Sequence, residues 1–146
     1  MTSSPFACKM APRMFTRLAL AFLLALLPLA SGCGGLPPAN AVVVYTMTSP
    51  ELSMASIDPE TGSWESAPWD AGDTGWLPYP SRGQLQVEHN LGHIPRTVIV
   101  YLAFDRVGTS PATAAGDLAR VVDVDASTLT VWNATNGSYF VRIVAR

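Results

Sequence analysis

The sequence of 146 residues is poor in cationic side chains, and its single lysine, Lys9, lies near the start. From residue 33 onward six arginines stand against all eleven acidic side chains, which leaves a net charge of −5. Nucleic-acid binding depends on clustered cations that neutralise phosphates. We therefore expect no nucleic-acid partner.

Cysteine is almost absent as well, because Cys8 and Cys33 are the only two. The remainder of the chain cannot form a disulfide scaffold, a cysteine nucleophile or a cysteine-ligated metal site. Two other motifs are also missing, the G-x-S-x-G nucleophile elbow and the D-x-D-x-D-G calcium loop. We expect neither an enzyme nor a bound metal or other cofactor.

The first 32 residues have the pattern of a signal peptide. A basic segment precedes the apolar run Leu18 to Leu29, which is shorter than the roughly 20 residues of a membrane-spanning helix. The run ends in Leu-Ala-Ser-Gly-Cys33, which resembles the lipobox of bacterial lipoproteins. This resemblance implies cleavage after residue 32, a lipid on Cys33 and attachment to a membrane of the bacterial envelope. Plain secretion and a retained N-terminal anchor are the alternatives.

The residue after the cysteine, Gly34, resembles lipoproteins sorted to the outer membrane more than those retained at the inner membrane, which implies an outer-membrane or cell-surface location. Residues 33–41 are rich in Gly and Pro and are predicted to form the lipidated tether. Residues 42–69 are predicted to be an N-terminal extension with a strand at 42–47 and a weaker one at 52–57. Asp58 to Gly62 is predicted to be a turn, with Pro near its start and Gly at its end.

Residues 70–146 are predicted to form the main domain. Apolar side chains alternate along residues 85–91, which is typical of a strand with one buried face, and residues 96–104 are apolar enough for the centre of a sheet. Further strands are expected at 118–124, 129–132 and 139–144, with residues 107–117 as a mobile surface loop. We predict an all-β fold, a small antiparallel β-sandwich of about six strands.

The segments Asp73-Thr74-Gly75-Trp76 and His89-Asn90-Leu91-Gly92, the apolar strand that follows, and a closing hairpin through Trp132 and Tyr139 resemble the H-type lectin module. Related modules occur in discoidin C-terminal domains and phage tail-fibre tips. The resemblance implies a six-stranded sandwich that forms trimers and binds sugars, often N-acetylgalactosamine, between subunits. The family's histidine and disulfide have no counterpart at the matching positions of this sequence.

The predicted closing hairpin offers the first candidate ligand site. Asn136-Gly137 is a strong hairpin signal because both residues tolerate positive φ. Trp132 is a candidate platform for stacking on a sugar ring, and Asn133 and Asn136 can hydrogen-bond to hydroxyls. Alternatively, Trp132 packs in the core and the two asparagines only shape the turn.

Three charged residues flank the predicted loop at 107–117. Asp105, Arg106 and Arg120 are candidates for holding sugar hydroxyls, because a carboxylate beside a guanidinium offers both acceptors and donors. Alternatively, they form a solvated rim in which an ion pair contributes little.

Two other groups are predicted to be structural. His89 falls on the inward phase of its strand and His93 lies in the turn before Pro95, so we expect no metal pair. Trp64, Trp69 and Trp76 lie in a Pro-rich stretch. This stretch is predicted to cover the sandwich with buried rings, with an exposed recognition surface as the alternative.

Together these features predict a surface or periplasmic lipoprotein that binds carbohydrate or a glycoconjugate without catalysis. The alternative is a structural or protein-interaction module of the cell envelope. The expected partners are the membrane, through the lipid, and a glycan or an envelope protein. A homo-oligomer, a trimer by resemblance, is a further expectation.

Overall fold

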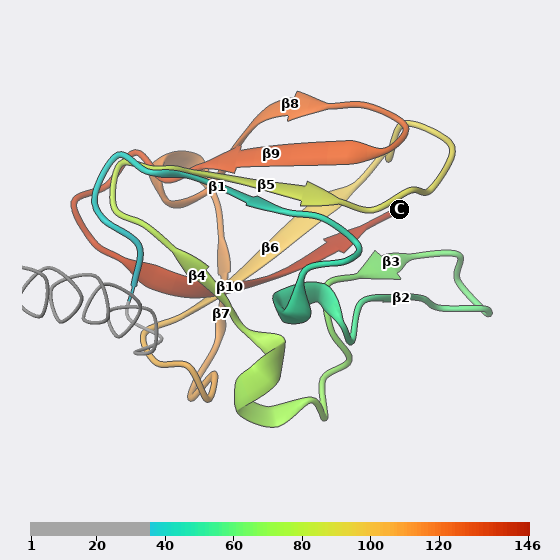
Figure 1. Ribbon diagram of the computed structural model, residues 1–146, viewed down its shortest axis with the longest axis horizontal. Coiled ribbons are helices and arrows are strands. Elements are labelled where there is room, and N and C mark those ends of the chain that lie inside the picture. The colour runs from blue at the N-terminus through green and yellow to red at the C-terminus, as the bar shows by residue number, and fades with distance from the viewer. Residues whose placement is uncertain (1–35) are drawn as a thin grey trace, which may run out of the picture. The chain divides into compact units, whose positions relative to one another are not determined.

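The computed structural model describes residues 36–146, except for the side chains of Asp73 and Thr74. This part of the chain forms ten short strands and three 3-10 helices of three or four residues (Figure 1). The predicted signal peptide and Cys33 lie outside the described residues. No helix within residues 36–146 has the length and hydropathy needed to cross a membrane.

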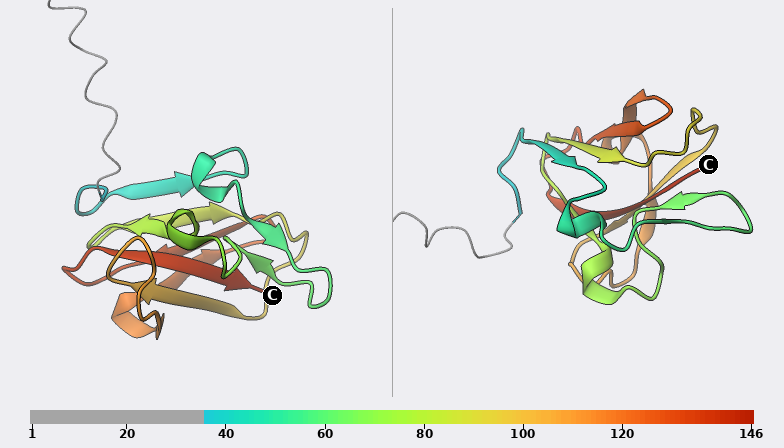
Figure 2. Two further views of the ribbon diagram at one scale, coloured as in Figure 1. Left: turned by 90° about the horizontal axis from the view of Figure 1, so that it is seen from below. Right: turned by 45° about the vertical axis from the view of Figure 1, so that its right-hand side comes forward.

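The first sheet has four strands in the order β1-β5-β9-β8. Their bounds are Val42–Tyr45 for β1, Gln84–Glu88 for β5, Thr128–Trp132 for β9 and Arg120–Val124 for β8. Strands β5, β9 and β8 run antiparallel, and a bulge interrupts β8 between Val121 and Asp123. Strand β1 lies at the outer edge, where the described chain begins (Figure 2).

The second sheet has the order β2-β3-β10-β6-β7, with β4 also paired to β10. The bounds are Ser56–Ile57 (β2), Trp64–Glu65 (β3), Leu77–Tyr79 (β4), Val98–Ala103 (β6), Ala112–Ala114 (β7) and Tyr139–Ala145 (β10). Strand β6 pairs with β10 on one side and β7 on the other, so the prediction of a central apolar strand is confirmed.

The core lies between the two sheets and follows the alternation of each strand. Leu85 and Val87 of β5 are fully buried, as the pattern of residues 85–91 predicts. Val141 and Ile143 of β10 face them from the other sheet and are also fully buried. Arg142, which lies between them in the strand, is therefore on the outer face of the second sheet. Two-layer burial of this kind confirms the predicted all-β sandwich.

Residues 42–69 belong to the same sandwich as residues 70–146, which revises the division at residue 70. Strand β1 pairs with β5, and β2 and β3 extend the second sheet. The turn at Asp58 to Gly62 is confirmed: its Gly62 has φ of 65° and its backbone N–H donates to the Asp58 carbonyl. Within the weaker strand predicted at 52–57, only Ser56–Ile57 is extended, because Pro50–Leu52 forms the 3-10 helix η1.

The antiparallel prediction is wrong for one pair of strands. Val42 to Tyr45 run parallel to Gln84 to Val87. A local pattern cannot fix this direction, because the two strands are separated by the whole of the β2 to β4 region.

The predicted hairpin at Asn136-Gly137 is also wrong. Strand β9 lies in the first sheet and β10 in the second, so residues 133–138 cross between the sheets. Neither Asn136 nor Gly137 has a positive φ. Asn136-Gly137 therefore marks a change in chain direction, but the strands before and after it do not pair with each other.

Residues 107–117, predicted to be a loop, contain regular secondary structure. They contain β7 and the start of the 3-10 helix η3 at Gly116–Leu118. Gly108 has φ of 77°, and a Cβ added there would lie 2.1 Å from the Trp76 indole nitrogen. The loop is therefore packed closely against Trp76.

Candidate functional site

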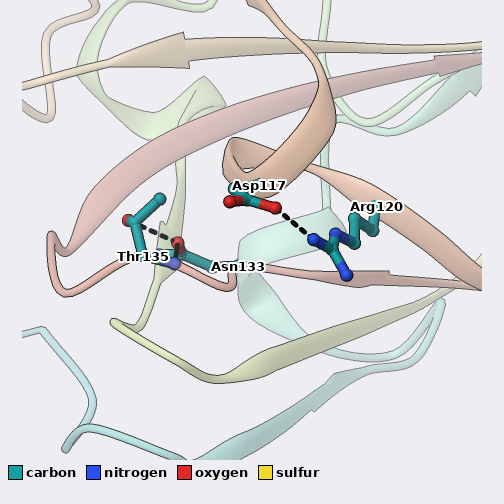
Figure 3. Close-up of polar contacts among 4 residues, drawn as sticks. All are labelled: Asp117, Arg120, Asn133 and Thr135. Atoms are coloured by element: carbon teal, nitrogen blue, oxygen red, sulfur yellow. Dashed lines mark hydrogen bonds and ion pairs between the residues drawn. The ribbon is translucent and has the colours of Figure 1, made fainter.

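Asn133 holds the crossover between the sheets and does not face solvent. Its side chain is fully buried, and its amide nitrogen donates to the carbonyls of Pro80 and Gly137 at 2.9 and 2.8 Å. Its oxygen accepts from the backbone N–H and the hydroxyl of Thr135, the latter drawn in Figure 3. The prediction of Asn133 as a ligand contact is corrected, because every polar atom of its side chain already has a partner.

Trp132 is half-buried on the outer face of the first sheet, between its cross-strand neighbours Gln84 and Arg120. The guanidinium carbon of Arg120 lies 5.2 Å from the ring centroid, a cation–π distance. The indole N–H donates to the Arg82 carbonyl at 3.3 Å. The Trp132 ring is thus outside the core, and Arg120 shields part of it from solvent.

Two of the other predicted residues lie beside Trp132. Arg120 forms an ion pair with Asp117 (Figure 3), and the exposed Asn136 accepts a hydrogen bond from Arg82 Nε at 2.6 Å. Arg82 connects Asn136 to Trp132, because its carbonyl accepts the hydrogen bond from the Trp132 indole. Arg82 and Asp117 are not among the residues that the sequence pattern pointed to. The groups bond mainly to one another, and the Asp117–Arg120 pair is well exposed, so this surface leaves few free donors.

Asp105 and Arg106 are placed elsewhere, directly after β6 in the second sheet. Asp105 accepts a hydrogen bond from the backbone N–H of Thr109 at 3.0 Å, and such N–H groups lower the pKa of its carboxyl below the usual value. Asp105 thus shapes the start of the 107–117 segment. The structure does not bring it to Trp132.

The most unusual cluster lies on the outer face of the second sheet. Residues 66–76 form an excursion from the edge of β10. It starts at Ser66, whose hydroxyl accepts a hydrogen bond from the Ile143 N–H, and it ends where Leu77 pairs with β10. This excursion carries two tryptophans over Arg142. The Arg142 guanidinium lies 4.7 Å from the Trp69 ring and 5.2 Å from the Trp76 ring.

Arg142 is buried to 1 % exposure, and its Nε and Nη1 have no hydrogen-bond partner among the described residues. Burial lowers the pKa of its guanidinium, and the carboxylates of Glu65 and Asp70 oppose that shift. Arginine nevertheless stays charged in proteins. The two indole rings therefore replace much of the hydration that this cation has lost.

Trp69 is the exposed member of this cluster. Trp69 is 53 % exposed, whereas Trp76 and Trp64 are buried, so the predicted burial holds for two of the three tryptophans. Tyr101 packs edge-on against Trp69 with centroids 4.8 Å apart. An outward arginine between Val141 and Ile143 is the sequence signal that would have pointed here.

Two neighbouring hollows lie around the Thr97–Arg146 end of the same sheet. One, of about 660 Å³, is lined by His93, Ile94, Arg96, Thr97 and Arg146. The other, of about 150 Å³, shares Thr97 and Arg146 and reaches Ser63 and, on the sheet, Ile99 and Val144. We call the two together the distal groove.

The histidines occupy different environments, as predicted. His89 is buried to 1 % exposure, and its Nδ1 accepts from Leu91 N–H at 3.2 Å. Its predicted position on the inward phase of the strand is therefore confirmed. His93 is exposed in the loop after β5 and lies on the rim of the distal groove.

No protein-family model, curated protein or solved structure matches this chain. The likeness to H-type lectins depends on the residues quoted above. Its sugar binding, its trimer and the roles of Trp132, Asn136, Asp105, Arg106 and Arg120 stay predictions.

Proposed function

We propose that this protein is a lipid-anchored, non-catalytic module of the bacterial cell envelope that binds carbohydrate on glycoconjugates. The observation that carries the proposal is the half-exposed ring of Trp69, held by Arg142 and Tyr101. An indole presents a flat apolar face on which the C–H groups of a pyranose can stack. A ring that is already fixed loses little conformational entropy when a ligand binds.

The surroundings of Trp69 support the same proposal. The distal groove offers the exposed hydroxyl of Thr97 and an apolar floor from Ile99 and Val144. Sugar binding needs this combination, because each sugar ring has an apolar face and a rim of hydroxyls. This face is favoured over the Trp132 surface, because Trp69 is an exposed residue and Trp132 is only partly exposed.

The position of the proposed site suits a membrane-anchored receptor. Val42 pairs with Gln84 at the start of β5, whereas His93 follows the far end of β5. The start of β1 and the C-terminal end of β10, which borders the distal groove, therefore lie at opposite ends of the sandwich (Figure 1). The described chain thus enters the sandwich at the end opposite the groove.

The test is a glycan array probed with full-length protein in detergent. Trp69→Ala should abolish binding, and Trp69→Phe should retain part of it. Phe104→Ala is the matched control, since Phe104 is an aromatic ring with 80 % exposure outside the cluster. Each variant is first shown by circular dichroism to be folded.

Two results would contradict the proposal. If folded wild-type protein binds no glycan at high density, carbohydrate binding is rejected. If Trp132→Ala removes binding and Trp69→Ala does not, the site lies on the first sheet.

A structural or protein-interaction module of the envelope is the second candidate function. It is favoured by exposed apolar residues on both outer strands of the first sheet, Val42 and Val44 on β1 and Val121 and Val122 on β8. Outer strands can pair with another chain. Chemical crosslinking in intact cells, followed by identification of the linked protein, tests this alternative.

A further inference from the structure

We propose that the distal groove is an anion subsite, so that the carbohydrate bound by this protein carries a carboxylate or sulfate group. This inference rests on the proposed function, because it names the ligand class of the same sheet face. Trp69 stacks on one sugar ring, and Arg96 and Arg146 bind the acidic group of that ring or its neighbour.

The register of the second sheet connects Trp69 to the groove. Tyr101 and Arg142, which contact Trp69, form one cross-strand pair, and Ile99 and Val144 form the pair two residues further along. Residues two apart on a strand share a face and lie about 7 Å apart. The stacking platform and the groove floor are therefore neighbours at the spacing of about one to two sugar rings.

Backbone hydrogen bonds hold Arg96 and Arg146, the two cations of the groove, next to each other. The Arg146 carbonyl accepts hydrogen bonds from the N–H groups of Arg96 and Thr97 at 2.6 and 2.9 Å, and Arg146 N–H donates to Thr97. Both arginine side chains start from this junction and line the same hollow. The site thus combines a rigid base with two flexible guanidinium groups.

These two arginines differ from most others in the described part of the chain. Arg120 is paired with Asp117, Arg82 is bonded to Asn136, and Arg142 is buried beneath Trp69. Neither Arg96 nor Arg146 forms an ion pair with a described side chain. Their donors remain available to a ligand.

The groove carries two arginine side chains, whereas the chain after residue 32 has a net charge of −5. No side chain that lines either part of the groove is acidic, and the main-chain oxygen of Arg146 is engaged by the N–H groups of Arg96 and Thr97. The nearest acid by register is Glu65, the cross-strand partner of Val144 on the groove floor. An anionic group is therefore expected at the Arg96 end, with the uncharged part of the sugar toward Glu65.

The chemistry of the donors selects the ligand class. A guanidinium presents planar pairs of N–H groups that match the oxygens of a carboxylate or sulfate, and such charge-assisted bonds are stronger than neutral ones. The Thr97 hydroxyl adds a donor or acceptor for a neighbouring sugar hydroxyl.

The experiment is isothermal titration calorimetry of full-length protein in detergent with matched trisaccharides. One arm compares trigalacturonic acid with galactotriose, and the other compares sulfated with unsulfated galactotriose. The acidic member of at least one pair should bind about tenfold or more tightly, the size expected for one charge-assisted contact. The arm that shows the preference identifies the acidic group.

Variants separate this inference from the proposed function. Arg96→Gln and Arg146→Gln should each reduce the acidic preference several-fold and leave the neutral sugar bound, whereas Trp69→Ala should abolish both. Arg82→Gln at the opposite end of the sandwich is the control. Equal binding of acidic and neutral sugars, or a preference that survives both groove variants, overturns the anion subsite alone. No binding of any sugar by folded protein overturns the proposed function with it.

Discussion

Arg142 and Trp69 form a stacked pair in which the fully buried partner is the cation and the exposed partner is the aromatic ring, at 4.7 Å. The usual arrangement is the reverse, since arginine is among the residues least often buried. The pair therefore fixes an indole at the surface by means of a charge in the interior.

Replacing Arg142 separates its packing role from its charge. Arg142→Met keeps most of the side-chain volume and removes the unpartnered N–H groups, so we expect a change in unfolding free energy of no more than about 1 kcal/mol. Trp69 should lose its support, which a red shift of tryptophan fluorescence would report. Arg142→Ala should instead cost about 3 kcal/mol because it leaves a cavity. Equal losses of stability in the two variants would contradict this view.

Gly108 and Gly116 form a matched pair for testing how tightly the 107–117 segment is packed. Both have a left-handed backbone, with φ of 77° and 60°, but only at Gly108 would a Cβ meet the Trp76 ring. Gly116→Ala should cost about 1 kcal/mol, the penalty of that conformation alone. Gly108→Ala should cost about 2 kcal/mol more, from overpacking. Chemical denaturation measures both, and similar values would show that the segment yields without resistance.

His89 should make stability depend on pH above the range in which carboxylates titrate. Burial lowers the pKa of His89 below its usual value of 6.5, opposed by the Thr128 backbone and the Asp125 carboxylate. The unfolded chain therefore binds the proton first as pH falls, and stability decreases from about pH 6.5 downward by at most about 1.4 kcal/mol per pH unit.

The control variants for this pH dependence follow from the hydrogen bonds. His89→Asn keeps an acceptor near Leu91 N–H and should flatten the stability curve between pH 7 and 5. His93→Asn, at an exposed site, is the control for the loss of a histidine. The carboxylates with lowered pKa, Asp58, Glu88, Asp105 and Asp125, act only below about pH 4.5. An unaltered slope in His89→Asn would assign the effect to other groups.

Asn133 should be worth more to stability than its exposed neighbour Asn136. Asn133→Ala leaves two carbonyls and the Thr135 donors without their partner in a buried turn, so we expect a loss of about 3 kcal/mol. Asn136→Ala removes one exposed contact to Arg82 and should cost less than about 1 kcal/mol. Thermal unfolding measures the difference, and equal losses would exclude a dominant role for Asn133.

The sequence predicted the parts of the fold that depend on alternation within one strand. Leu85 and Val87 are buried as their spacing indicates, and the apolar strand β6 is central to its sheet. Strand partners were harder to predict, because pairing depends on residues far apart in the chain. The parallel β1 and β5 and the crossing at Asn136-Gly137 are both of this kind.

The same distinction applies to the candidate site. The sequence indicated Trp132 and Arg120, which do lie together, but it also included Asn133, whose burial follows from contacts with Pro80 across the fold. It could not separate Trp69 from Trp64 and Trp76 by exposure. That difference depends on Arg142, more than 60 residues later, and on the way residues 66–76 rejoin the sheet.

The parallel pairing of β1 with β5 has a mechanical consequence. A pull on the chain before Val42, resisted by a ligand held in the distal groove, runs along β1 toward the opposite end of the sandwich. All residue pairs from Val42–Gln84 to Tyr45–Val87 then bear the force together in shear. An antiparallel edge strand pulled from its start in the reverse direction would peel away one pair at a time. If the chain is anchored before Val42 as proposed, β1 is oriented to transmit tension between that anchor and a ligand on the sandwich.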